Sequence, residues 1–362
     1  MSQVSMFRKD LHQIPELGFE EVKTQAYLLH HLEKLGCEIT TVRTGIVAYF
    51  DQGAETTLAF RCDMDALPIT EATGLPFAST HKGKMHACGH DGHMAILLGL
   101  AYEIAQNRAS LNKNVVLVFQ PSEERDAGAN VIIDSGLLQK YGVSEMYGLH
   151  LWPKLNKGQM YSRPGAFMAG ASEVDVIVHG EATHIANTGE GINAMHIGAR
   201  LILDINALDE DIPEDQFSFI RFGKMVSGVA QNVVSPRTEF NGTIRTFAPA
   251  TMVALKRKLE AFAKTYEEVF NTTIDIVYRD GYAPVLNNAK LLEGLIAKGI
   301  NIQSLDKPSM TAEDFGLYAK IVPTVFFFLG VGDVAPLHHE AFDFDMTVLD
   351  QGVAFFKDII GL

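Results

Sequence analysis

Apolar positions follow two different periodicities in the first half of the chain. Some segments place apolar residues three and four positions apart, the spacing of one helix face, and others are short apolar runs of the strand type. The run 114–119 is apolar almost throughout, as expected for a strand whose two sheet faces are both covered. The pattern predicts helices over 20–34 and 94–105 and strands over 47–50, 57–60, 114–119 and 145–151. Because strands and helices alternate, an α/β layer architecture is indicated.

The amino-acid composition changes near 163–172, where proline, glycine and alanine accumulate, and this change indicates a connection between two domains. The residues that follow predict strands over 174–178, 217–225, 238–245 and 273–278 and helices over 191–208 and 249–270. Their order is β-α-β-β-α-β, the ferredoxin-like split unit, which is complete in itself. We therefore expect an inserted domain over 173–284. After this domain helices and strands alternate again, with a helix predicted over 289–297, a strand over 324–329 and a helix over 346–360.

Composition narrows the class of protein. The chain has 362 residues, of which 47% are hydrophobic, and its formal net charge is −14. The length allows two domains, and the negative charge is opposite to that of a surface that binds nucleic acid. No apolar run approaches the roughly 20 residues of a membrane-spanning helix. Cys37, Cys62 and Cys88 form no disulfide framework, and the first residues carry no apolar signal segment. We therefore expect a reduced, cytoplasmic protein that binds neither nucleic acid nor membrane.

Polar side chains that can bind metal follow four of the predicted strands. Residues 61–65 and 120–124 each follow a strand directly, His150 ends a third strand, and residues 338–339 follow the last strand through a loop. A fifth segment, 86–93, contains three histidines and a cysteine and opens an apolar helix. Because sites in open α/β sheets form beyond the carboxyl ends of strands, we expect these five segments to converge on one crevice.

The segment 86–93 predicts metal ligands. Cys88 and His90 flank Gly89, so a turn at the glycine can aim both side chains at one ion, with His86 and His93 in support. Thiolate and imidazole are good ligands for zinc, manganese-class or nickel ions. The alternative is a buried structural cysteine, which the neighbouring glycine and aspartate disfavour.

Glu123 and Glu124 are adjacent carboxylates that can divide two roles between them. One can coordinate a metal ion, and the other can take a proton from water that the metal has made acidic. The alternative is a solvated charge pair, but the preceding apolar strand and Pro121 place the pair where a buried crevice would begin.

Each of the other candidate metal-site residues also has a purely structural explanation. His150 can be a core histidine, and His338 and His339 can be surface residues of a loop. Asp63 and Asp65 can cap loops, or Asp63 can orient a ligand histidine, because such ligands usually have a hydrogen-bonded partner. The chain contains no G-x-S-x-G, G-x-G-x-x-G or Walker motif, so the serine-hydrolase and nucleotide-binding classes are disfavoured.

Seven motifs follow one another in an order that a known family shares. They are RCDMDALPI (61–69), MHACGHDGHMA (85–95), VFQPSEE (118–124), YGLH (147–150), GTIRT (242–246), TAEDF (311–315) and PLHH (336–339). Together with the opening LHQIPELGFEE (11–21) they resemble the M20 metallopeptidase family, most closely its amidohydrolase branch, subfamily D. The resemblance spans essentially the whole chain.

The resemblance implies two bound divalent ions of manganese, zinc, cobalt or nickel. It implies that Glu123 is the general base, which takes a proton from the attacking water and passes it to the leaving amine, with Asp63 in support. Cys88 takes the position of a bridging carboxylate in other branches. His339 stays open as an alternative to His338 for the metal ligand of this loop. The implied ligands are Cys88, His90, Glu124, His150 and His338.

The middle domain supplies the substrate contacts that the resemblance implies. His184, in GEATHIA (180–186), takes the place of a family histidine that reaches a neighbouring active site and helps to hold the oxyanion. Thr183 replaces the glycine that precedes this histidine, and a later Pro-His pair is absent, so the lid geometry and a homodimer through this domain stay open. Asn232 and Arg245 match positions that grip the polar end of a substrate, and a guanidinium binds a carboxylate through two hydrogen bonds. The alternative for Arg245 is an exposed strand residue.

The implied reaction is the hydrolysis of a small N-acyl amino acid to a carboxylic acid and a free amine. Residues 1–172 and 285–362 would form the metal-binding catalytic domain, and 173–284 the lid. The opening segment and GYAPVLNN (281–288) most resemble bacterial deacetylases of N-acetyldiaminopimelate in lysine biosynthesis, although broad N-acyl or N-benzoyl amino-acid hydrolases share almost the same motifs. A di- or aminopeptidase is one rival, and a non-catalytic binding protein, disfavoured by Glu123, is another.

Overall fold

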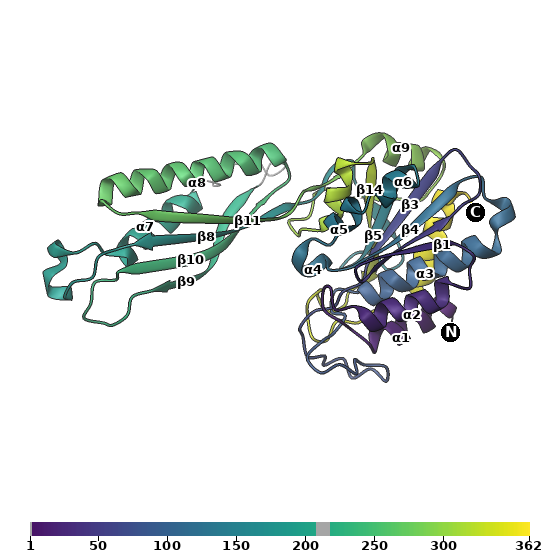
Figure 1. Ribbon diagram of the computed structural model, residues 1–362, viewed down its shortest axis with the longest axis horizontal. Coiled ribbons are helices and arrows are strands. Elements are labelled where there is room, and N and C mark those ends of the chain that lie inside the picture. The colour runs from purple at the N-terminus through teal and green to yellow at the C-terminus, as the bar shows by residue number, and fades with distance from the viewer. Residues whose placement is uncertain (1, 208–217) are drawn as a thin grey trace. The chain divides into compact units, whose positions relative to one another are not determined.

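The protein, described by a computed structural model over residues 2–207 and 218–362, divides into two compact units (Figure 1). The first unit consists of the chain up to Phe167 together with Leu286–Asp306 and Asp314–Leu362. The second unit consists of Met168–Val285 and the short segment Lys307–Glu313. Each unit is therefore built from segments that are discontinuous in sequence.

The first unit is organised around an eight-stranded sheet with the strand order β1-β2-β4-β3-β5-β14-β6-β13. At its centre β4, β3, β5 and β14 run parallel, and β3 and β4 are buried at every position because both faces of the sheet are covered. The carboxyl ends of these parallel strands therefore lie along one edge. The strands are β1 Glu38–Val42, β2 Gly45–Phe50, β3 Thr57–Asp63, β4 Asn114–Gln120, β5 Val143–Pro153, β6 Met160–Ser162, β13 Gln303–Ser304 and β14 Thr324–Gly332.

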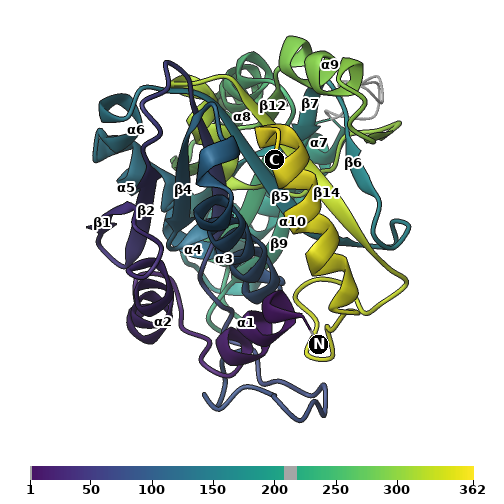
Figure 2. The same cartoon turned by 90° about the vertical axis from the view of Figure 1, so that its right-hand side faces the viewer.

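Helix α3 is the central helix of this unit. It is buried along most of its length, and α1, α2 and α10 pack around it in one apolar core with the sheet (Figure 2). The helices are α1 Gln3–His12, α2 Val22–Leu32, α3 His90–Gln106, α4 Glu123–Asp126, α5 Ala129–Asp134, α6 Leu137–Lys140, α9 Ala289–Ala297 and α10 Thr347–Ile360. Short 3-10 segments cover Arg108–Ser110 and Asp314–Lys320.

The predicted α/β architecture is confirmed, and the differences in detail have physical causes. The helix predicted over 289–297 has the bounds of α9, while the helix predicted from residue 94 already begins at His90. Four polar or glycine residues open α3, and all of them are buried, so the apolar pattern starts one turn late. The pattern does not predict α1, because its buried face includes Arg8 and His12.

The second unit has the predicted β-α-β-β-α-β order and an antiparallel sheet with the strand order β11-β8-β10-β9. Its two helices bury apolar faces against the sheet in a separate core. The helix predicted over 249–270 has the bounds of α8, whereas the ends of two predicted elements, residues 208 and 217, lie outside the described residues. The elements are β8 Gly170–His179, α7 Ala194–Asn206, β9 Phe219–Ser227, β10 Arg237–Thr246, α8 Pro249–Phe270 and β11 Ile274–Tyr282.

A few short elements complete the chain. Strands β7 Gly165–Met168 and β12 Val285–Asn287 pair with each other where the chain passes between the units, and a 3-10 segment covers Ile185–Glu190. Within residues 2–207 and 218–362, no helix combines the length and hydropathy that a membrane crossing needs.

Candidate metal centre

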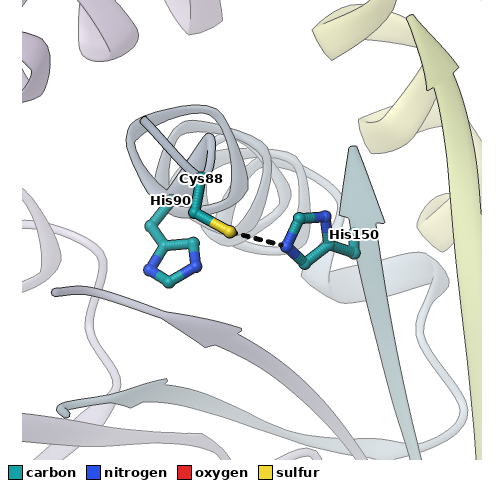
Figure 3. Close-up of side chains that lie close together, drawn as sticks. All are labelled: Cys88, His90 and His150. Atoms are coloured by element: carbon teal, nitrogen blue, oxygen red, sulfur yellow. Dashed lines mark hydrogen bonds between the residues drawn. The ribbon is translucent and has the colours of Figure 1, made fainter. Parts of the chain in front are cut away.

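Three of the predicted ligands, Cys88, His90 and His150, lie together in the first unit (Figure 3). The Cys88 sulfur lies 3.4 Å from His150 Nε2, and the donor atoms of all three residues lie within 4.8 Å of one another. All three side chains are buried. A thiol and two imidazoles in one buried space form a donor set that suits a transition-metal ion.

Gly89 produces this arrangement on the side of α3. It stands at the N-cap of the helix with φ of 86°, a left-handed conformation that glycine adopts without steric cost. The space around it is also limited, since an added Cβ would lie 3.3 Å from a methyl carbon of Leu151. The chain thus turns between Cys88 and His90, and the Cys88 sulfur points to His150 near the carboxyl end of β5 (Figure 3).

The two histidines present the same ring nitrogen to the centre. His90 Nδ1 lies 2.8 Å from the backbone oxygen of Asp65, and His150 Nδ1 lies 2.7 Å from that of Leu151. A carbonyl oxygen only accepts, so each Nδ1 is a donor and each Nε2 is the nitrogen left to bind a ligand. His90 Nε2 has no hydrogen-bond partner among the described residues. This buried orphan atom fits a bound cation, which would satisfy it.

Glu124 and His338 extend the donor set. His338 Nε2 lies 3.2 Å from Glu124 Oε1, and both donor atoms lie within 4.8 Å of the Cys88 sulfur. His338 has φ of 64°, and its backbone N–H donates to the carbonyl oxygen of Ala87, which ties its loop to the segment that carries Cys88. The five predicted ligands therefore come together from four separate stretches of the chain.

His339 and His86 do not join this set. The His339 ring is exposed, and its Nδ1 accepts a hydrogen bond from the backbone N–H of Ala341 within its own loop. His86 is buried, and burial lowers its pKa to about 3, so it is a neutral ring. Of the two adjacent histidines of the loop, His338 is the one that reaches the other donors.

The Asp65 carboxylate fixes the backbone of the two adjacent glutamates. One of its carboxylate oxygens accepts the backbone N–H of Glu123 at 2.9 Å, and the other accepts that of Glu124 at 3.0 Å. Its backbone oxygen is the acceptor for His90. Asp65 thus fixes three residues of the centre at once. The sequence patterns assign it no more than a loop cap, because a hydrogen bond to a backbone N–H leaves no signature in the residue types.

Asp63 belongs to a buried hydrogen-bond network with His93 and Arg61. Its Oδ1 lies 2.6 Å from His93 Nδ1, and its Oδ2 accepts from the Arg61 guanidinium at 2.8 Å. His93 Nε2 accepts the backbone N–H of Leu151, so this ring uses both nitrogens within the protein. The predicted role of Asp63 was to orient a ligand histidine. Its hydrogen bond is to His93, and His90 Nε2 lies farther away, at 3.8 Å.

The charges of these groups favour a cation at the centre. Burial lowers the pKa of His90, but Asp63 and Asp65 outweigh it and raise that pKa to about 10. Burial and the carboxylates of Glu124 and Glu123 raise the pKa of the Cys88 thiol well above its usual range. Both shifts express excess negative charge in a low-dielectric space, which a divalent ion would offset.

Trp152 borders the centre on β5. Its ring centroid lies 5.5 Å from that of His150, and it stacks on Phe328 with 3.8 Å between centroids and 14° between planes. His150 and Phe328 are directly paired in the parallel register of β5 and β14. The ligand strand is therefore braced on one side by an aromatic pair.

The remaining predicted site residues belong to the second unit. His184 and Asn232 are exposed and lie on adjacent loops, because the backbone N–H of Ile185 donates to the Asn232 carbonyl oxygen. The His184 ring accepts a hydrogen bond from the N–H of Ala186. Arg245 is half-buried near the end of β10, and burial lowers the pKa of its guanidinium.

Thiol, imidazole and carboxylate donors gathered beyond the carboxyl ends of parallel strands form a site that can hold divalent metal ions. A family model described as peptidase family M20/M25/M40 matches residues 59–361. The chain belongs to this family and is a metal-dependent hydrolase that acts on amide bonds. The family that the sequence motifs indicate is thereby confirmed.

Individual relatives resemble the chain over nearly its whole length. The N-acetyldiaminopimelate deacetylase of Streptococcus uberis is 35% identical over 370 residues, which cover 99% of this chain and 98% of that protein. The protein of the same name from Brevibacillus brevis is 36% identical over 349 residues, covering 93% and 92%. A solved structure from Bacillus subtilis, described as a dinuclear metal binding peptidase of the M20 family, is 29% identical with a TM-score of 0.87 and covers 99% of this chain and 96% of its own.

Proposed function

We propose that the protein removes the acetyl group from N-acetyldiaminopimelate, using two divalent ions held in the first unit. The observation that carries the proposal is the donor set, in which two triads share one sulfur: Cys88, His90 and His150 form one triad, and Cys88, Glu124 and His338 form the other. Because Cys88 belongs to both triads, its thiolate would help to hold each of the two ions. The same donors suit zinc, manganese, cobalt or nickel.

The chemistry is divided between the ions and Glu123. Bound divalent ions polarise an amide carbonyl and bring the pKa of water into the neutral range. Glu123 takes the proton from the attacking water and returns it to the leaving amine, which is general acid–base catalysis by one carboxylate. The hydrogen bonds that the backbone N–H groups of Glu123 and Glu124 donate to Asp65 support this division, because they fix the base beside a ligand. In this proposal Asp63 supports the centre through His93 rather than touching the substrate.

The substrate is proposed to be held by residues of the second unit. The guanidinium of Arg245 and the amide of Asn232 offer donors to a carboxylate and a polar end group, and His184 offers an imidazole to the oxyanion. Residues 173–284 act as a lid in this proposal, and pair with a second copy of the chain as a homodimer.

Two curated relatives at 35% and 36% identity carry the deacetylase name, and this supports N-acetyldiaminopimelate as the substrate. Diaminopimelate is a precursor of lysine, so the proposed place of action is lysine biosynthesis in the cytoplasm. The amide bond, the free carboxylate beside it and the small acyl group are the features that the site must recognise.

The test is hydrolysis of a substrate panel after the protein has been loaded separately with zinc, manganese, cobalt and nickel. The panel contains N-acetyl-L,L-diaminopimelate, N-acetyl and N-benzoyl derivatives of other amino acids, and free dipeptides. The expected result is the highest kcat/KM for N-acetyl-L,L-diaminopimelate. Higher values for N-benzoyl amino acids or for dipeptides would replace the proposed substrate class, and no turnover of any member would overturn the proposed function.

A further inference from the structure

The segment 121–124, which carries Glu123 and Glu124, is held by its backbone. Three successive N–H groups of this segment, those of Ser122, Glu123 and Glu124, each donate to a buried carboxylate. Asp65 accepts the second and third. The first is accepted by Glu21, the last residue of the opening segment 11–21, to which the sequence motifs assign no role at the centre.

Glu21 reaches this segment from a distant part of the sequence. It stands at the N-cap of α2, but its side chain caps no N–H of that helix. Its Oε1 instead accepts the backbone N–H of Ser122 at 2.9 Å, and its Oε2 accepts from the hydroxyl of Thr44 at 2.5 Å. The residue is fully buried, so both carboxylate oxygens depend on these protein partners.

The N–H that Glu21 accepts belongs to a residue in an uncommon conformation. Ser122 has φ of 53°, in the left-handed region that residues other than glycine seldom adopt. Such a conformation persists only where the surroundings determine it, and it occurs often at functional sites. Ser122 directly precedes Glu123, so its backbone angles set the direction in which the two glutamates leave the strand.

Steric contacts leave this segment little room to move. A Cβ added to Gly18 would lie 2.4 Å from the Ser122 Oγ, and a Cβ added to Gly128 would lie 1.7 Å from the carbonyl oxygen of Pro121. The backbone N–H of Gly128 also donates to the Ser122 carbonyl oxygen. The hydrogen bond to Glu21 therefore acts on a segment that two glycines approach closely and that a second backbone hydrogen bond also holds.

We infer that Glu21 is a positioning residue for Glu123 and Glu124, acting through the backbone N–H of Ser122. By holding Ser122 in its left-handed conformation, it places the general base and the adjacent metal ligand together. The inference deepens the proposed function and rests on it for the role of Glu123. It differs from a purely structural role, because it concerns the aim of two side chains and not only the stability of the fold.

The test compares two buried glutamates of the same N-terminal segment. Glu21→Met keeps the length of the side chain and removes both acceptors. The matched control is Glu16→Met, because Glu16 is also buried and accepts from the N–H and hydroxyl of Thr24, which lie in α2 and not in the glutamate segment. Glu21→Gln keeps one oxygen for the Ser122 N–H and serves as the rescue variant. The measurements are kcat, KM, Tm and the affinity for Zn²⁺ by chelator competition.

For Glu21→Met, kcat is expected to fall roughly 10–100-fold, the usual effect of losing a residue that orients a metal site, with KM close to the native value and Zn²⁺ bound more weakly. Glu21→Gln is expected to keep kcat within about threefold, since one acceptor remains. Glu16→Met is expected to lower Tm while kcat stays within about twofold, because Thr24 does not touch the segment.

Two results would overturn the inference: a Glu21→Met variant with native kcat and native Zn²⁺ affinity, or an equal loss of kcat in Glu16→Met at equal Tm. Failure of the proposed function gives a different signature. If the native protein hydrolyses no member of the panel, the Zn²⁺ affinity alone decides the inference, because Glu124 belongs to the segment that Glu21 holds. If Glu123→Gln retains native activity, the general base is wrong, and the Zn²⁺ measurement again decides the role of Glu21.

Discussion

The candidate metal centre of the first unit and the candidate substrate residues of the second unit differ in how firmly the protein holds them. Cys88, His90 and His150 are 7%, 1% and 4% exposed, and both ring orientations are fixed by backbone carbonyl groups, while the His338 side chain is the exposed member of the set, at 52%. His184 and Asn232 are exposed, and the hydrogen bonds that involve them connect their own loop and the adjacent one.

This difference teaches that the two tasks of the protein have different structural requirements. A metal centre needs ligands fixed to within fractions of an ångström before the ion arrives, whereas a group that recognises a substrate can adjust on binding. The metal ligands and Glu123 are therefore expected to respond to substitution through kcat and metal content, and the proposed substrate-binding residues Asn232 and Arg245 through KM. The following predictions test this separation.

Removal of the divalent ions is expected to have the largest effect and to abolish hydrolysis. The reason is that no described residue of the centre can replace the ions in polarising the carbonyl. The measurement is activity after chelation and dialysis, then after addition of each metal, with the metal content determined in parallel. Hydrogen exchange should become faster in the segments of the centre and stay unchanged in β8 and β10. Full activity without metal, or an equal loss of protection in both units, would refute the separation.

Glu123→Gln is expected to lower kcat by roughly 10²–10⁴-fold, the usual contribution of a general acid–base group. The metal content should equal that of the native protein, because Glu123 is proposed as the base and not as a ligand. Glu124→Gln is the matched variant on the neighbouring residue, and it should lose metal as well as activity. Equal metal loss in both variants would show that the two glutamates do not divide their roles.

Asp65→Asn is expected to lower kcat by roughly 10–100-fold, because the amide accepts through only one oxygen and the N–H of Glu123 or Glu124 loses its partner. Asp63→Asn is the comparison, and its main expected effect is on Tm, since it breaks a buried ion pair with Arg61. Steady-state kinetics and thermal unfolding separate the two. A larger loss of kcat in Asp63→Asn at native Tm would reverse the two roles.

Arg245→Ala is expected to raise KM about 10–100-fold, the equivalent of one charged hydrogen bond, with native metal content. Arg237→Ala is the control on the same strand, because Arg237 is exposed and pairs with Glu239 at 2.7 Å. KM for the N-acyl substrate is the measurement, with a substrate lacking the carboxylate as a second comparison. An unchanged KM in Arg245→Ala would remove this residue from the substrate contacts.

His339→Ala is expected to have the smallest effect, with kcat and metal content within about twofold of the native values. Its ring is exposed and accepts a hydrogen bond from the backbone N–H of Ala341 within its own loop. The adjacent substitution His338→Ala should lower the metal content, because this ring lies 3.2 Å from Glu124. The opposite outcome for the two variants would exchange their assignments.

Much of the fold follows from patterns within single segments. The continuous apolar run of β4 and the helical spacing of apolar residues in α8 are local features. The residue types alone therefore indicate both elements. The short C-G-H motif is equally local, because one glycine turn sets the positions of Cys88 and His90. These parts of the site could be predicted without knowing the rest of the chain.

Other parts depend on contacts between distant segments. Helix α1 places Arg8 against Asp91, 83 residues away, and this buried ion pair has no pattern of its own in the sequence. Asp65 and Glu21 hold the glutamate segment through its backbone N–H groups, which every residue except proline possesses, so residue identity cannot point to these contacts. His93 resembles a ligand in the sequence, and only its two hydrogen bonds, to Asp63 and Leu151, show that both nitrogens are used.

The aromatic pair beside His150 has a practical consequence. Trp152 is the single tryptophan of the chain, and its ring lies 5.5 Å from the His150 ring. Its fluorescence therefore comes from one known position next to the candidate centre, with no second indole to obscure it. The protein thus carries an intrinsic optical reporter, through which the arrival of an ion or a substrate near His150 can be followed in real time without a label.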